Sequence, residues 1–221
     1  MSRRPRAVRI LLRASPVAVV AVLVGVLAQL PAGASFVAAT DDRGNSIGSS
    51  TNFCARSDYL SPVATAWTDQ AAPTPQDNST LVVRSGDQAN AMAFVRFDLP
   101  VHEPWCVLYA ATLRVYNTTP DGTRVIDAVE VDPAAPRWST ATLTWGNQPA
   151  GTGGAVGGSK DSTVGQQVWG VTPSVQDQYT HGNNGFLLRQ RDGATDPTTH
   201  RMLYEGGLSG PRAAQLQLDW H

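Results

Sequence analysis

The chain has 221 residues, 17 of them basic and 18 acidic, and this length is typical of one domain with a short appendage. The first 34 residues contain five arginines and no acidic residue, so the remainder holds 12 basic against 18 acidic side chains, a net charge of −6. This balance excludes a general attraction to nucleic acid, which favours a basic surface. Binding of an anionic ligand would therefore need a local basic patch.

The N-terminus is typical of a secretory signal peptide. Arginines precede an uncharged apolar run over residues 17–30, and small residues follow it at 31–34. A run of 14 residues is short for a membrane span, which needs roughly 20 residues. We predict cleavage after Ala34, a secreted or cell-surface protein, and no membrane contact after cleavage. A retained membrane anchor is the alternative.

Residues 35–53 are polar and rich in small side chains, and we predict that they form a leader or a weak edge strand. A single domain is then expected over residues 54–221. This domain contains both cysteines of the chain, Cys54 and Cys106. Because the chain is predicted to be exported, a disulfide between them is expected. Closing that loop would contribute about 4 kcal/mol to stability on the chain-entropy model.

Short segments with the alternation of β-strands follow one another along the domain. In residues 91–99 the apolar side chains at odd positions share one face, while Arg96 and Asp98 lie on the other. This pattern predicts a strand with one face in a core. Further strands are predicted at residues 63–67, 80–84, 107–117, 124–132, 166–171, 186–190, 201–205 and 213–220.

The turns between these segments suggest how the strands are connected. An Asp-Gly turn indicates that residues 107–117 and 124–132 form a hairpin. One short helix is predicted at residues 173–179, with Thr172 as its N-cap. Many short strands and little helix predict an all-β fold, an antiparallel jelly-roll β-sandwich.

Two segments between the predicted strands allow a structural or a functional interpretation. Trp138 and Trp145 lie in a polar stretch, where they are interpreted as buried plugs, with sugar-stacking platforms as the alternative. The glycine-rich residues 151–159 lack the Lys-Ser/Thr ending of a phosphate loop. We predict that they form a flexible surface loop.

Six short motifs occur in a characteristic order between residue 63 and the C-terminus. They are STLVVRS at 79–85, AFVRFDLP at 93–100, ATLRVY at 111–116, LTWGNQP at 143–149, NGFLLR at 184–189 and AQLQL at 214–218. In this order they resemble the DNRLRE-type domain of secreted bacterial and archaeal proteins, also classed as carbohydrate-binding module family 96. The resemblance implies a jelly-roll β-sandwich with a non-catalytic role in holding polysaccharide, including acidic glycans such as alginate. Cys54 and Cys106 resemble a cysteine pair of actinobacterial members.

Arginines within the predicted strands are the candidate ligand-binding residues. Guanidinium groups bind carboxylates through two hydrogen bonds, and aromatic rings stack on the apolar faces of sugars. If the strands are neighbours, these side chains form one basic and aromatic sheet face that binds an anionic polysaccharide. The predicted face consists of Arg84, Arg96, Arg114, Tyr116, Arg189 and Tyr204. The alternative is that the arginines form cross-strand ion pairs of small energetic value.

Catalysis fits the sequence poorly, and no enzyme is predicted. Tyr204 with His200 and Arg201 is the best available set for a polysaccharide lyase. The pair Asp127 and Asp132 could act as acid and base, but any β-protein offers such pairs.

No cofactor is expected. A structural calcium ion is the one metal for which we consider a site. Asp69, Asp192 and Asp196 are available in predicted loops as ligands of a structural calcium ion. Besides an extracellular glycan-binding module, the second class of function is a structural surface or matrix protein without a soluble ligand.

Overall fold

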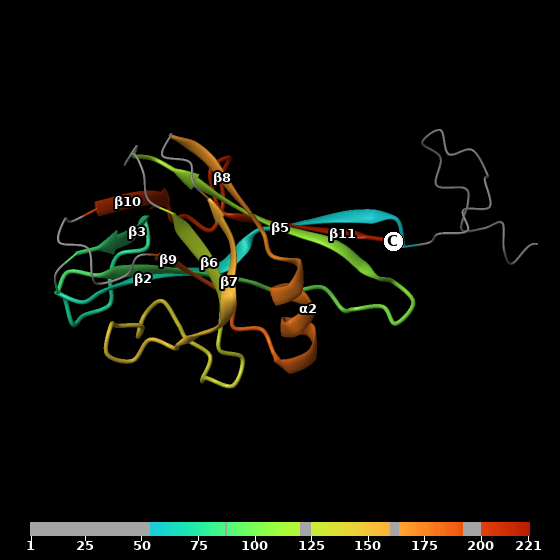
Figure 1. Cartoon of the computed structure of the whole chain (residues 1–221), viewed down its shortest axis with the longest axis horizontal. Coiled ribbons are helices and arrows are strands. Elements are labelled where there is room, and N and C mark those ends of the chain that lie inside the picture. Colours follow the sequence, from blue (N-terminus) through green and yellow to red (C-terminus); the bar gives the residue numbers. More distant parts are fainter. Residues whose placement is uncertain (1–53, 87, 120–124, 160–163, 192–199) are drawn as a thin grey trace, which may run out of the picture. The chain divides into compact units, whose positions relative to one another are not determined.

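The computed structural model describes residues 54–221 except 87, 120–124, 160–163 and 192–199 (Figure 1). The predicted signal peptide and leader lie outside these residues. The described part contains the strands β1 (Arg56–Leu60), β2 (Pro62–Asp69), β3 (Thr80–Ser85), β4 (Ala91–Phe97), β5 (Leu108–Asn117), β6 (Ile126–Val131), β7 (Gly151–Ser159), β8 (Gly165–Gly170), β9 (Phe186–Gln190), β10 (His200–Glu205) and β11 (Gln215–Trp220), and the helix α2 (Thr172–His181).

The strands form two ladders in which neighbours run antiparallel. One ladder has the order β1–β11–β5–β8, and the other has the order β2–β4–β9–β6–β7. Strands β10 and β3 pair with each other and link the two ladders. The link uses single residue pairs, Tyr204 opposite Asn117 on β5 and Arg84 opposite Ala91 on β4.

Apolar side chains from both ladders meet in one core. The odd positions of β4 point into it, as the alternation predicts. Its largest members are fully buried, namely Trp169, Tyr204, Phe97, Phe186, Leu81, Leu113, Leu188 and Leu216. The prediction of an all-β sandwich is therefore confirmed, while the jelly-roll connectivity stays a prediction.

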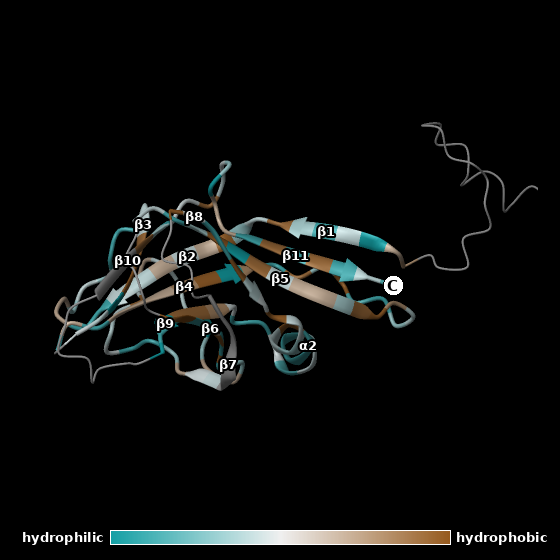
Figure 2. Cartoon of the chain, turned by 45° about the horizontal axis from the view of Figure 1, so that its top comes forward, coloured by the Kyte–Doolittle hydropathy of each residue, from teal (hydrophilic) through white to brown (hydrophobic). Residues whose placement is uncertain are grey.

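A second, smaller apolar cluster covers the opposite face of the β2–β4–β9–β6 ladder. The connection between β6 and β7 folds over this face and contributes Trp138 and Leu143, which pack with Phe94 and Leu187. Strand β6 consequently has both faces buried, and every one of its residues is buried. It appears largely hydrophobic in Figure 2, while α2 is largely hydrophilic.

Two of the predictions for this region are wrong. The predicted hairpin of residues 107–117 and 124–132 does not form, because β5 pairs with β11 and β8 while β6 pairs with β9 and β7. The glycine-rich residues 151–159 are not a loop but strand β7. A Cβ atom at Gly151 would lie 2.8 Å from Cγ1 of Val129, so the absence of a side chain allows β7 to approach β6 closely.

Two local details also differ from expectation. Strand β1 was not predicted, since its alternation is weak and it lies at the edge of the sheet beside β11. Thr172 is the first residue of α2 and not its N-cap, and Val171 precedes it without a side-chain capping bond. The Thr172 hydroxyl instead accepts a hydrogen bond of 2.8 Å from the amide of Ala111, which ties the helix to β5.

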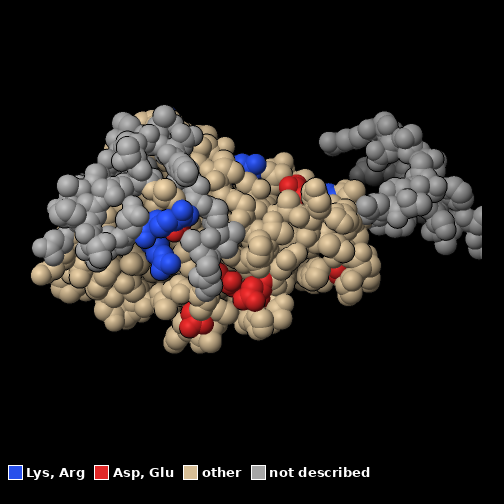
Figure 3. All heavy atoms as spheres, in the orientation of Figure 1, with Lys and Arg blue, Asp and Glu red and all other residues tan. Residues whose placement is uncertain are grey.

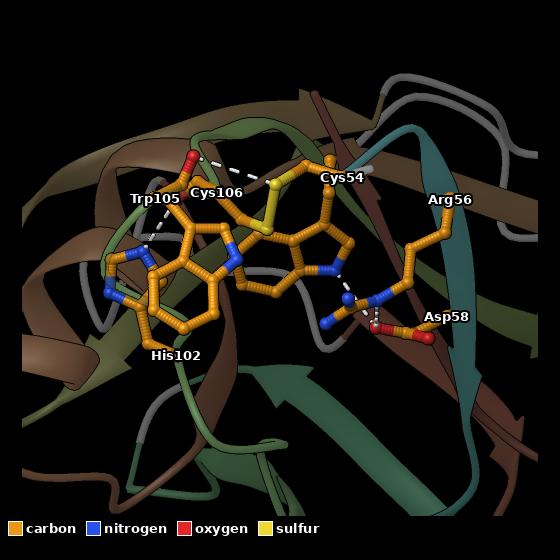
Figure 4. The surroundings of a disulfide bond; sticks show 7 residues. Cys54, Arg56, Asp58, His102, Trp105 and Cys106 are labelled. Atoms are coloured by element: carbon orange, nitrogen blue, oxygen red, sulfur yellow. Dashed lines mark hydrogen bonds and ion pairs between the residues drawn. A yellow bond between two sulfur atoms is a disulfide. The ribbon is translucent and has the colours of Figure 1, made fainter. Parts of the chain in front are cut away.

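The predicted disulfide between Cys54 and Cys106 is confirmed. It joins the start of the domain to the connection between β4 and β5. Figure 4 shows His102 and Trp105 on one side of the bond and Arg56 and Asp58 on the other. Among the described residues, no helix has the length and apolar character that a membrane span requires.

Candidate functional site

Trp138 is a buried plug, as one of its two interpretations predicts. Its ring is 5% exposed and makes an edge contact with Phe94 at 5.7 Å between centroids. The indole N–H donates a hydrogen bond of 2.8 Å to the carbonyl of Asn184. These contacts fix the connection between β6 and β7 onto the ladder beneath it.

Arg96 lies underneath the same connection and is 9% exposed. Its Nη1 donates to the Trp138 carbonyl at 2.7 Å, and its guanidinium stacks on the Trp138 ring at 5.0 Å. Burial lowers the pKa of Arg96 from its ordinary value, and the nearby charge of Arg137 adds to this effect. Arg96 therefore supports the fold, and the expectation that it lies on an open binding face is wrong.

Tyr204 is also inaccessible to a polysaccharide. It lies in the core with no exposed surface, and its hydroxyl donates a hydrogen bond of 2.7 Å to Oε1 of Gln167. Burial raises the pKa of the phenol far above its ordinary value. Both the ligand-binding role and the lyase role considered for Tyr204 are therefore wrong, and the side chains of His200 and Arg201 lie outside the described residues.

Arg114 and Tyr116 lie on the other ladder, on the face of β5 that points away from the core. The Nη1 atom of Arg114 donates to Oε1 of Gln217 at 2.7 Å. The guanidinium of Arg212 stacks on the Tyr116 ring at 4.7 Å. The six predicted residues thus do not form one face, because the strands that carry them belong to different layers.

Arg84 and Arg189 do come together, and they do so beside Trp145. A cavity of about 150 Å³ lies between them, and we call it the Trp145 pocket. It is lined by Arg84, Ser85, Asn90, Ala91, Met92, Trp145, Arg189 and Gln190. Four separate segments supply these residues: the ends of β3, β4 and β9, and the connection between β6 and β7.

The two arginines of this pocket differ in their partners. Arg84 forms an ion pair with Asp69 at 2.7 Å and donates to the carbonyl of Ala89. Arg189 is paired in register with Asp127, but that carboxylate binds Arg191 at 2.7 Å. Within the described part of the chain, no hydrogen bond or ion pair involves the Arg189 guanidinium. Arg189 therefore offers a positive charge to a ligand.

Buried polar atoms of the pocket also lack partners. Oγ of Ser85 and both amide atoms of Gln190 are inaccessible and make no hydrogen bond to any residue that the structure describes. Such groups normally find partners, because leaving one unpaired costs about 1–3 kcal/mol. A polar ligand at this position could supply the missing bonds. Nothing in the local sequence indicates this role for Ser85 or Gln190.

Trp145 is held in place by the segment that carries it. The amide of Thr144 donates to Oδ1 of Asn147 at 2.7 Å, and Nδ2 of Asn147 donates to the Thr142 carbonyl at 2.8 Å. Oε1 of Gln148 accepts from the Thr68 hydroxyl at 2.6 Å, which fixes the segment to β2. These bonds fix the backbone on both sides of Trp145, whose half-buried indole offers a surface on which a flat group can stack.

The surface charges are otherwise sparse. On the face drawn in Figure 3, most of the described surface carries neither acidic nor basic side chains, and the largest group of basic atoms lies in one place, with smaller groups apart from it. Among the described residues, no group of three or more His, Cys, Asp or Glu is arranged to hold a metal ion. Of the calcium candidates, Asp69 is engaged by Arg84. Asp192 and Asp196 lie outside the described residues.

The most perturbed carboxyl group lies away from the pocket, at Glu130 on β6. Its side chain is 6% exposed and lies close to the carboxyl group of Asp177 on α2. Burial, together with the charge of Asp177, raises the pKa of Glu130 to about 7. Between the ordinary pKa near 4.5 and this value, the folded protein holds a proton that the unfolded chain has lost.

This shift predicts how stability depends on pH. The contribution of Glu130 is fully present below about pH 4.5 and is lost as the pH rises through about 7. The loss amounts to about 2–3 kcal/mol between pH 5 and pH 8. Denaturant unfolding of the Glu130→Gln variant should show a smaller decrease over this interval than the unaltered protein. Equal decreases in both proteins would refute the assignment.

A comparison with protein-family models identifies the family to which this chain is related. Residues 56–201 match the model of carbohydrate-binding module family 96, and this range includes Arg84, Trp145 and Arg189. No curated protein sequence matches the chain. The family match covers well over half of the chain and nearly all of the strands. The chain therefore belongs to carbohydrate-binding module family 96.

Proposed function

We propose that this domain binds an acidic polysaccharide outside the cell, without cleaving it, through the Trp145 pocket. The observation that carries the proposal is the Arg189 guanidinium, which has no partner among the described residues and lines the same cavity as Trp145. A sugar acid has the two matching features, a carboxylate for the arginine and an apolar ring face for the indole. The family membership supports the polysaccharide class of ligand.

The size of the pocket limits what it can hold. A volume of about 150 Å³ is below the roughly 300–1,000 Å³ typical of sites that enclose small molecules. We therefore expect one uronate unit to rest on Trp145 and to direct its carboxylate inward, while the rest of the polymer stays on the surface. The unpaired Ser85 and Gln190 side chains would then hydrogen-bond to the same sugar unit.

Arg189→Ala and Trp145→Ala are each expected to weaken the binding of oligouronates by roughly 10–100-fold. A charge-assisted hydrogen bond contributes about 1.5–3 kcal/mol. Stacking of a nucleic-acid base on an aromatic side chain contributes about 1–3 kcal/mol, and we take the same order of magnitude for a sugar ring on Trp145. Calorimetric titration with hexamers of guluronate, mannuronate and galacturonate measures the effect. Raised salt should also weaken binding, because the Arg189 contact is ionic.

Arg114→Ala is the matched control, since it removes the same group from the outer face of the other ladder. We expect this variant to bind like the unaltered protein. An equal loss in Arg114→Ala, or no loss in Arg189→Ala, would reject the Trp145 pocket as the site. Failure of the unaltered protein to bind any glycan would favour a structural role at the cell surface.

A further inference from the structure

A second and larger cavity lies beside α2 and shares no residue with the Trp145 pocket. Its volume is about 580 Å³, within the range of sites that hold a small ligand. We call it the helix cleft and define it by Asp98, Leu99, His102, Arg137, Gln178 and Tyr179. It is bounded by the connection between β4 and β5, the residues that follow β6, and one side of α2.

The wall formed by the β4–β5 connection is fixed by the disulfide at Cys106. The Nε2 atom of His102 lies 2.9 Å from the Cys106 carbonyl, as Figure 4 shows. A carbonyl oxygen can only accept, so Nε2 carries the proton, and Nδ1 of the neutral ring is left as an acceptor. The His102 ring also packs on Tyr179 at 5.2 Å and on Trp220 at 5.6 Å. Its position therefore does not depend on a ligand.

Gln178 supplies a buried acceptor to the helix cleft. Its side chain is 3% exposed, and Nε2 donates to the Gly185 carbonyl at 3.3 Å. This bond fixes the orientation of the amide and leaves Oε1 buried at the wall of the cleft, without a hydrogen-bond partner in the described part of the chain. A ligand that donates a hydrogen bond to this oxygen would satisfy it.

The rim of the cleft has no net charge. Asp98 and Arg137 form an ion pair of 3.3 Å, with side chains that are 69% and 61% exposed. An exposed pair of this kind is weak and can exchange its bond for one to a ligand. The carboxylate of Asp98 accepts hydrogen bonds only. Asp98, His102 and Gln178 therefore offer acceptors, while the buried hydroxyl of Tyr179, which has no hydrogen-bond partner among the described residues, can donate or accept. Arg137, the cation of the described lining, is already paired with Asp98.

We propose that the helix cleft binds a neutral sugar unit, whose hydroxyl groups donate to Oε1 of Gln178, Nδ1 of His102 and the carboxylate of Asp98. The apolar side of the sugar ring would lie against Leu99 and the adjoining apolar residues of the wall. A carboxylate-bearing unit is disfavoured here, since Asp98 already neutralises the Arg137 guanidinium and would repel a second carboxylate. The module thus carries two subsites of opposite preference, and this second subsite does not depend on the first.

Titration of the whole chain with neutral hexasaccharides of glucose, mannose, galactose and xylose tests this proposal. We expect at least one of them to bind, and Asp98→Ala to weaken that binding by roughly 3–10-fold. Gln178→Leu should weaken it by at least 10-fold. Gln178 is buried, so the Gln178→Leu variant can fail to fold. In that case the affinity of the Asp98→Ala variant, whose substituted side chain is exposed, tests the proposal.

Arg189→Ala serves as the control that separates the two subsites. It should leave neutral-sugar binding unchanged while weakening oligouronate binding. In nuclear magnetic resonance spectra, the side-chain amide of Gln178 should shift when the neutral sugar is added. Absence of binding to every neutral hexasaccharide, or unaltered affinity in Asp98→Ala together with an unshifted Gln178 amide, would overturn the proposal.

Discussion

Replacing Trp138 with alanine is expected to lower the free energy of unfolding by about 3–5 kcal/mol, the range for large-to-small changes in a core. The variant loses the edge contact with Phe94 and the hydrogen bond to the Asn184 carbonyl. It also exposes Arg96, whose guanidinium stacks on this ring. The connection between β6 and β7 would then be released from its ladder, and Trp145 would lose its support.

Trp105→Ala is the control for this experiment, because Trp105 is 71% exposed. The same substitution there should change the free energy of unfolding by no more than about 0.5 kcal/mol. Chemical denaturation followed by fluorescence measures both values. A cost below about 1 kcal/mol at Trp138 would mean that the β6–β7 connection is not anchored as the structure shows.

Loss of the disulfide is expected to cost about 4 kcal/mol, which follows from the length of the loop it closes. Cys54 and Cys106 are separated by 52 positions in the chain. The bond ties Cys54, two positions before β1, to the β4–β5 connection. Without it, β1 has only β11 as a partner strand and is expected to detach first.

Guanidinium unfolding of the Cys54→Ser/Cys106→Ser variant, beside the unaltered protein with and without reductant, measures this cost. The variant and the reduced protein should agree with each other. Faster hydrogen exchange should appear in residues 56–60 before the rest of the domain. A difference from the oxidised protein below about 1 kcal/mol, or uniform exchange throughout the domain, would contradict the assigned role.

The sequence predicted the strands well wherever one face is buried and the other is wet. In β11 the alternation alone identifies the residues that enter the core. In β4 it identifies Ala93, Val95 and Phe97, although Phe94 and Arg96 on the opposite face are buried as well. A strand was also predicted at residues 124–132, where β6 lies, but its predicted partner was wrong and β7 was missed. Both faces of β6 are buried, because the β6–β7 connection covers the outer one, and the glycines of β7 carry no side chains from which a period could be recognised. Strand pairing between distant segments has no local signal either.

The same covering segment explains the mixed outcome for the site residues. Arg84 and Arg189 were identified because charged residues interrupt apolar strands, and they share a pocket. Arg96 shows the same local pattern, yet Trp138 folds over it. Tyr204 faces inward through the alternation of β10, where its hydroxyl finds Gln167 on β8. These differences arise from contacts between remote segments, which a single sequence does not reveal.

A crystal structure of the domain with a bound oligouronate tests the central claim most directly. The account predicts a sugar ring stacked on Trp145, with its carboxylate within hydrogen-bonding distance of the Arg189 guanidinium. The hydroxyl of Ser85 or the amide of Gln190 should also contact the same sugar unit. A ligand bound on the Arg114 and Tyr116 face, with the Trp145 pocket empty at saturating concentration, would contradict it.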